Sequence, residues 1–171
     1  MKRHGVVFGL FTLMTAAISS VPLAARATES AHKGGCIVLT TVAETEQVSK
    51  ASDGTESKTY VPAKHVVPDS VVVWTTSARN VCAKGAEHVV INQPVPEHMN
   101  FVADSAVGGG TQIALSVDGK DFHPANQLTV REQDGSTRPA RATDVHMVRW
   151  TLDGALAPQD QVTVRYRAVL Q

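Results

Sequence analysis

Aromatic residues, cysteines and excess charge are all scarce in this sequence of 171 residues. It contains 4 Phe, 2 Trp, 2 Tyr and 2 Cys, and its 16 basic side chains are balanced by 16 acidic ones. Nucleic acid is therefore not a predicted partner, because binding it requires a concentrated basic patch. The few rings also leave no surplus for stacking on bases.

A long hydrophobic run is also missing, since no apolar segment reaches the roughly 20 residues that a membrane-spanning helix needs. The N-terminus instead combines Lys2 and Arg3 with an apolar run over 6–14 and small residues ending at Ala27. These features predict a signal peptide, residues 1–27, that is removed on export to the periplasm, the outer surface or the exterior. The remaining 144 residues, with 13 basic and 16 acidic side chains, fit one domain without a membrane span.

Catalytic motifs are absent as well. The sequence has no G-x-S-x-G elbow, phosphate-binding loop or paired-carboxylate motif, so it predicts neither an enzyme nor a cofactor. Asp104, Asp118, Asp121 and Asp134 each belong to a predicted turn or loop. We interpret them as turn residues, because an Asp side chain there accepts hydrogen bonds from nearby backbone.

What the sequence does contain is a series of short segments with β-branched composition or period-two alternation. These segments are 36–48, 59–61, 70–78, 87–92, 100–103, 113–117, 127–131, 145–153 and 162–170. Turn residues such as Asp53-Gly54 separate them, and no amphipathic helix is evident. The pattern predicts an all-β fold: an immunoglobulin-like antiparallel β-sandwich of seven to nine strands over 36–171, after a flexible arm at 28–35.

Alternation also predicts which side chains form the core and where the strands end. Trp74 is the best single candidate for a core anchor, and the expected core is Trp74, Trp150, Ile91, Leu115, Val148, Val164 and Tyr166. Pro94 and Pro96 are expected to stop ladder pairing, because proline has no backbone N–H. Gly108, Gly109 and Gly110 are expected to form a flexible loop.

The two cysteines, Cys36 and Cys82, both follow the predicted cleavage site and would meet an oxidising compartment. If the strand that opens at Cys36 runs antiparallel to segment 70–78, its start lies beside the other strand's end, close to Cys82. We therefore predict a disulfide that closes a loop of 47 residues. Two separate reduced thiols remain the alternative, because a small register error would exceed the Cα separation of about 7 Å that a bridge allows.

Histidine is the residue type most suited to a metal site here, since imidazole binds copper and zinc. Six histidines follow the leader, namely His32, His65, His88, His98, His123 and His146. They lie on six different segments without a metal-binding spacing, so surface or core-edge positions are the simpler interpretation. Met99, beside His98, is the only neighbour with a soft ligand atom.

Four stretches together resemble a known family. They are VVINQPVPEHM at 89–99, FVADSA at 101–106, SVDGKDF at 116–122, and Val148-Arg149-Trp150 before Leu156-Ala157-Pro158. From about residue 67 to 170 the chain resembles domain of unknown function 11, a repeat domain also found in the chlamydial large cysteine-rich outer-membrane protein and in many bacterial surface proteins. The resemblance implies an immunoglobulin-like sandwich in an exported or envelope protein, commonly in several copies and without a known active site. This chain departs from that pattern in having one copy and no visible cell-wall sorting motif.

Two functional hypotheses follow. The first is a structural or protein-interaction module of the bacterial envelope or extracellular space, which meets a protein partner through edge strands or end loops. The second is a periplasmic protein that binds a metal or small ligand, with a site built from the histidines and the loop around Glu97, His98 and Met99.

Overall fold

The computed structural model describes residues 28–30 and 35–171, and almost every element in that part of the chain is a β-strand. The strands are β1 (Thr28–Ser30), β2 (Ile37–Lys50), β3 (Glu56–Pro62), β4 (Val71–Asn80), β5 (Val90–Pro94), β6 (Met99–Phe101), β7 (Val107–Gly108), β8 (Thr111–Ser116), β9 (Thr129–Arg131), β10 (Thr137–Pro139), β11 (Met147–Leu152) and β12 (Gln161–Leu170). Two single-turn 3-10 helices, η1 (Ala125–Gln127) and η2 (Ala142–Asp144), complete the set. The predicted leader, residues 1–27, lies outside the described residues.

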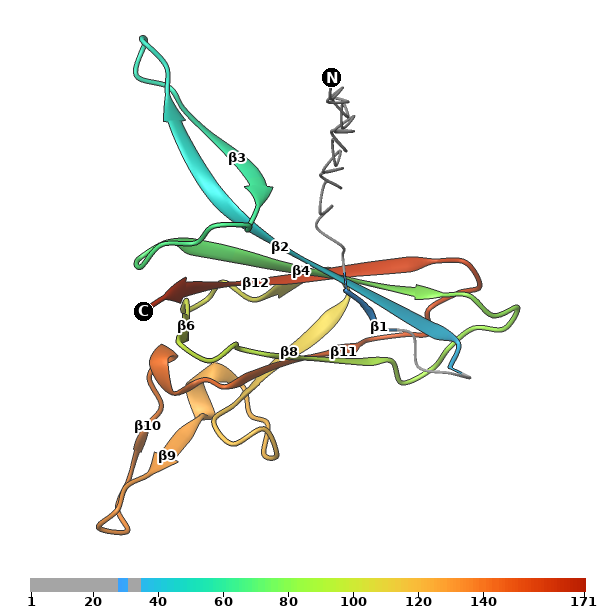
Figure 1. The fold of residues 1–171 in the computed structure, drawn as a ribbon. Helices are drawn as coiled ribbons and strands as arrows, with labels where there is room; N and C mark the ends of the chain where they lie inside the picture. The colour runs from blue at the N-terminus through green and yellow to red at the C-terminus, as the bar shows by residue number, and fades with distance from the viewer. Residues whose placement is uncertain (1–27, 31–34) are drawn as a thin grey trace, which may run out of the picture.

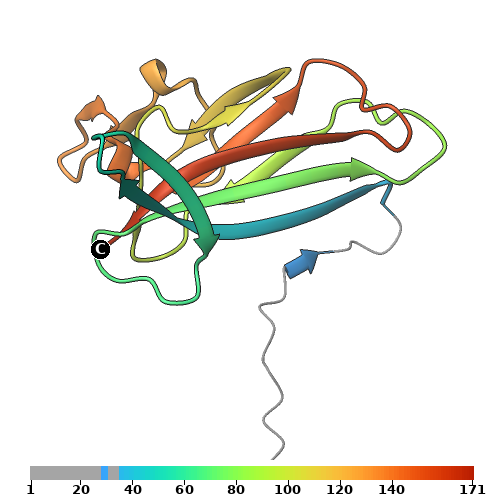
Figure 2. The same ribbon diagram turned by 90° about the horizontal axis from the view of Figure 1, so that it is seen from above.

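Two antiparallel sheets form the body of the protein (Figures 1 and 2). In the larger sheet β4 and β12 are central, β1 and β3 both pair with the outer side of β2, and β6 and β7 both pair with β12. The smaller sheet has the order β5-β11-β8, and β9 and β10 form a separate hairpin. This arrangement confirms the predicted all-β antiparallel sandwich.

The strand count differs from the predicted seven to nine. The described residues contain twelve strands, of which only seven, β2, β3, β4, β5, β8, β11 and β12, have five residues or more. The strands that lie outside every predicted segment are β1, β7 and β10, and each has two or three residues, too few to show an alternating pattern. One of them, β1, pairs with Leu39–Thr41 of β2, so the predicted flexible arm at 28–35 begins with a strand.

The core lies between the two sheets, where β11 and β12 face each other. Six of the seven predicted core residues are buried, namely Trp150, Tyr166, Ile91, Val148, Val164 and Leu115. Trp74 is only partly buried, although its ring stacks on Tyr166 with centroids 6.5 Å apart. The prediction of Trp74 as the main anchor is therefore wrong. Its neighbours in the sheet are Tyr166 and Ala43, and an alanine covers little of an indole ring, whereas Trp150 is enclosed completely.

The predicted disulfide between Cys36 and Cys82 is present, with the Cα atoms 5.1 Å apart. Cys36 precedes β2 and Cys82 follows β4. These strands are antiparallel, with Ile37 opposite Asn80, so the start of one lies beside the end of the other as the sequence argument required. The bond joins the N-terminal edge of the larger sheet to its centre.

The structure corrects the expectation that Pro94 ends ladder pairing. β5 includes Pro94, which lies opposite Met147, and the N–H of Val95 still donates to the carbonyl of His146 at 2.8 Å. Because backbone groups alternate in direction along a strand, the nitrogen of Pro94 points away from β11. β5 is an edge strand of its sheet, where a missing N–H costs no ladder bond.

The structure also corrects the expectation of a flexible loop at Gly108. This residue belongs to β7 and lies opposite Val164 of β12. A Cβ atom at this position would lie 2.8 Å from Cγ1 of Val164 and 3.0 Å from Cδ1 of Trp150. Gly108 is therefore required because the backbone passes directly over the core, and no side chain fits there.

The hairpin of β2 and β3 extends beyond the body of the sandwich (Figure 1). The fourteen consecutive residues 47–60 are all exposed. We call this segment the ribbon. Its turn is the predicted Asp53-Gly54 turn, in which Gly54 has a φ of 87° and the N–H of Thr55 donates to Oδ1 of Asp53 at 2.9 Å. The return strand β3 begins at Glu56, earlier than the predicted 59.

Candidate functional site

Two of the six histidines meet in one pocket. His98, after β5, and His146, before β11, line a pocket of about 370 Å³ together with Glu97, Met99 and the C-terminal Gln171. His65 lines a different pocket beside the ribbon, and His88 and His123 line neither of the two. His32 lies outside the described residues. The fold thus brings together the loop that the sequence singled out and one further histidine.

Backbone hydrogen bonds hold the two histidine segments in place. The carbonyl of His146 accepts from the N–H of Val95, and the carbonyl of His98 accepts from the N–H of Gln171 at 2.8 Å. His98 has a φ of 62°, a left-handed conformation that turns the chain between β5 and β6. Gln171 therefore lines the pocket while its N–H bonds directly to the backbone of His98.

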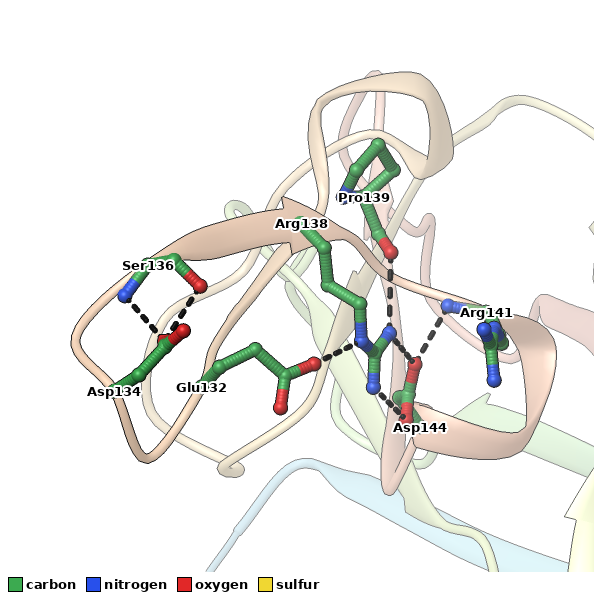
Figure 3. A network of polar contacts seen from close by, with 7 residues as sticks. All are labelled: Glu132, Asp134, Ser136, Arg138, Pro139, Arg141 and Asp144. Atoms are coloured by element: carbon green, nitrogen blue, oxygen red, sulfur yellow. Dashed lines mark hydrogen bonds and ion pairs between the residues drawn. The ribbon is translucent and has the colours of Figure 1, made fainter.

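A polar network around Arg138 and Asp144 fixes the segment that precedes His146 (Figure 3). Arg138 of β10 donates to both carboxylate oxygens of Asp144 at 2.7 and 3.1 Å, and it also pairs with Glu132. Asp144 accepts a further bond from the N–H of Arg141 at 2.7 Å, which closes the turn of η2. Arg138 and this N–H hold the pKa of Asp144 at about 2, well below its usual range. The network ties the β9–β10 hairpin to η2, two residues before His146.

The pocket is lined largely by polar side chains, among them His98, His146 and Glu97. Both imidazoles are exposed, and Met99 packs partly against the core. In the part of the chain that the structure describes, no three His, Cys, Asp or Glu side chains lie close enough together to hold a metal ion. The pocket thus offers two imidazole side chains, as nitrogen ligands or hydrogen-bonding groups, within reach of solvent.

The turn aspartates act as the sequence predicts at two of the four positions. Asp118 accepts from the backbone N–H groups of Lys120 and Asp121 at 2.8 and 2.9 Å, and these bonds lower its pKa to about 2. Asp134 accepts from the N–H of Ser136 at 2.9 Å. Each of these carboxylates stabilises its own turn, a structural use that needs no ligand.

The ribbon is the second candidate site, and its base is held by an ion-pair cluster that the sequence did not reveal. The carboxylate of Glu46 is 11% exposed and lies 2.6 Å from Nζ of Lys58 on β3 and 3.1 Å from Nη2 of Arg167 on β12. The hydrogen bond from Lys58, helped by the charge of Arg167, lowers the pKa of Glu46 below its ordinary value. Arg167 lies directly opposite Val73 of β4, which is buried on this outer face of the sheet.

The backbone of β3 has one paired and one open edge. The N–H of Ala51 donates to the carbonyl of Thr55, and the N–H of Ala63 donates to the carbonyl of Ala43, both in register with the β2–β3 ladder. Since these groups alternate along an antiparallel strand, the odd-numbered residues of β3 bond to β2. The N–H and C=O groups of Glu56, Lys58 and Tyr60 therefore point away from β2, and β2 is the only described strand with which β3 pairs.

Comparisons with protein-family models, with curated proteins and with solved structures give no match for this chain. None of the helices among the described residues is both long and apolar enough to cross a membrane. The case for function therefore rests on the two candidate sites themselves.

Proposed function

We propose that this protein is an exported protein-interaction module of the bacterial envelope or extracellular space, and that it binds its partner through the ribbon. One observation carries the proposal: residues 47–60 are exposed on both faces and contribute no residue to the core. An isolated two-stranded hairpin is only marginally stable in water. A partner surface that covers the ribbon would therefore stabilise it. Val48 and Tyr60, both exposed apolar residues, supply contact area for such a surface.

Two further observations support the location and class in this proposal. Disulfides such as Cys36–Cys82 form and persist in oxidising compartments outside the cytosol. The resemblance of residues 67–170 to domain of unknown function 11 points the same way, because that family occurs in bacterial surface proteins. We assign the protein no catalytic step and no cofactor.

Site-specific photo-crosslinking in cells that export the protein tests the proposal. A photoreactive amino acid replaces Val48 of the ribbon, which is 55% exposed, or Val90 of β5, which is 45% exposed and serves as the matched control. We expect a discrete crosslinked product from position 48 and none from position 90. Equal yields at both positions, or no product at either, would overturn the ribbon as the contact surface.

The second candidate function is binding of a small ligand or a transition metal, and the specific observation in its favour is that His98 and His146 line one pocket. Metal analysis of protein purified without an affinity tag tests it, together with copper(II) titration of the variants His98→Ala and His146→Ala. Binding that is lost in both variants but retained in His65→Ala would support this function. Metal-free protein with no saturable titration would exclude it for copper.

A further inference from the structure

We propose that the occupant of the open β3 edge is a second copy of this chain, so that two ribbons pair antiparallel across a two-fold axis at Ser57. This inference rests on the proposed function of the ribbon and names its partner. The edge offers the N–H and C=O groups of Glu56, Lys58 and Tyr60, every second residue of the strand, all of which point away from β2. A matching edge on a second copy can satisfy the groups of Glu56 and Lys58, and pairing of identical edges gives a closed, symmetric dimer.

Charge and turn geometry select the register. An axis at Lys58 would place Lys58 directly opposite its own copy, and like charges in that position are destabilising. An axis at Ser57 instead places Glu56 opposite Lys58 of the second copy, twice by symmetry, so that each pair joins opposite charges. In this register Gly54, in the turn of one copy, lies opposite Tyr60 of the other. The paired segment therefore stops at the two turns and does not reach Pro62, the last residue of β3.

The features that usually protect a sheet edge are weak along this one. Exposed lysine is a common guard, but Nζ of Lys58 lies 2.6 Å from the carboxylate of Glu46, at the base of the ribbon. Proline is another guard, but Pro62 is the last residue of β3 and lies beyond the three open residues. Residues 56–60 are all exposed. Dimerisation would join the two larger sheets into one continuous sheet.

Cysteine substitution tests the register directly. With the axis at Ser57, residues 57 of the two copies form a non-hydrogen-bonded pair with Cα atoms about 4.5 Å apart, which suits a disulfide. Thr59 then lies opposite Thr55 of the second copy, and Ser49 lies on β2, away from the open edge. We therefore expect Ser57→Cys to give a covalent dimer under mild oxidation at least tenfold faster than the matched controls Thr59→Cys and Ser49→Cys.

Sedimentation equilibrium of the exported protein without added cysteines gives the second measurement. We expect a reversible monomer–dimer equilibrium, weakened about tenfold by Glu56→Lys, which replaces two opposite-charge pairs by two like-charge pairs. A mass that stays monomeric at every concentration, or equal crosslinking rates at positions 49, 57 and 59, would overturn the inference. Faster crosslinking at 59 than at 57 would overturn it too, because it requires another axis.

These outcomes separate this inference from the proposed function. A monomer in sedimentation that still crosslinks from position 48 to a different protein in cells would overturn self-pairing and leave the ribbon as an interaction surface. A dimer whose mass is unaffected by Glu56→Lys, and which fails to crosslink from position 48 in cells, would overturn both.

Discussion

In the body of the sandwich, strands such as β11 and β12 bury every second side chain, whereas in the ribbon all fourteen residues from 47 to 60 are exposed. Both regions are built from antiparallel strand pairs, so their backbone hydrogen bonding is alike. What differs is the origin of their stability. The body is held by apolar burial around Trp150 and Tyr166, while the ribbon relies on its own ladder and on the ion pairs of Glu46 at its base.

That difference shows how to recognise an interaction element in a small β-protein. Strand geometry alone does not distinguish a structural hairpin from a binding one, because both satisfy their backbone in the same way. The distinguishing feature is a strand pair that contributes nothing to the core and yet has a defined turn and a fixed base. Here the ion pairs of Glu46 fix the base of the ribbon, and residues 47–60 remain exposed for a partner to cover.

The largest expected contrast comes from truncating one residue in each region. Trp150→Ala should lower the free energy of unfolding by about 3 to 5 kcal/mol, because the side chain is fully buried between the sheets. Val48→Ala in the ribbon should change it by less than about 0.5 kcal/mol, since exposed positions contribute little. Urea unfolding of both variants measures the contrast. Comparable losses would mean that the ribbon belongs to the folding core.

Removing the disulfide should have an effect of nearly the same size on the body. Cys36→Ser with Cys82→Ser opens a loop of 47 residues, which the chain-entropy model makes worth about 4 kcal/mol. Thermal unfolding of this double variant measures the loss. Thiol titration of exported protein, denatured without reductant, is the control, and two free thiols per chain would show that the bond does not form in the cell.

A smaller effect should follow from removing one hydrogen bond between the sheets. The hydroxyl of Tyr166 on β12 donates to the carbonyl of Pro94 on β5 at 2.7 Å. Tyr166→Phe retains the buried ring but leaves that carbonyl without its donor, so we expect a loss of about 1 to 3 kcal/mol in urea unfolding. Tyr60→Phe in the ribbon is the matched control, and an equal loss there would contradict the comparison.

The smallest effect should be a dependence of stability on acid. The pKa of Asp144 is lowered in the folded protein from 3.8 to about 2, chiefly by Arg138. The folded state therefore gains stability from this carboxylate above about pH 4, and the gain is lost as the pH falls from about 4 to 2. Arg138→Met should remove this part of the pH dependence. Parallel stability curves for the two proteins over that range would contradict it.

The sequence was sufficient for most of the strand faces and for the disulfide, which depend on local alternation and on the pairing of two strands. The face of β12 that contains Val164 and Tyr166 follows from period two, and the Cys36–Cys82 bond follows from one antiparallel pairing. The family resemblance and the predicted leader stay predictions, since no comparison matches the chain and residues 1–27 lie outside the described part.

What the sequence could not provide depends on partners far apart in the chain. Asn80 is fully buried, and besides its bond to nearby Lys84 its side-chain amide donates to the carbonyl of Leu156, 76 residues along the chain, at 2.9 Å. Glu46 is likewise fixed by Arg167, a residue of the last strand. No local pattern encodes such pairs, and the pocket of His98 and His146 was missed as a pair for the same reason. The hairpin of the ribbon, by contrast, was predictable, because the sequence indicates its turn at Asp53-Gly54 and a strand on either side of it.

Amide hydrogen exchange along β3, measured at several protein concentrations, tests the central claim that the ribbon finds its pairing outside the sandwich. The N–H groups of Ser57, Thr59 and Val61 bond to β2 and should be protected at every concentration. The N–H groups of Glu56 and Lys58 should exchange rapidly in dilute protein and slow as the concentration rises, while that of Tyr60, opposite the turn of the second copy, should stay fast. Rapid exchange of Glu56 and Lys58 at all concentrations would contradict pairing between two ribbons.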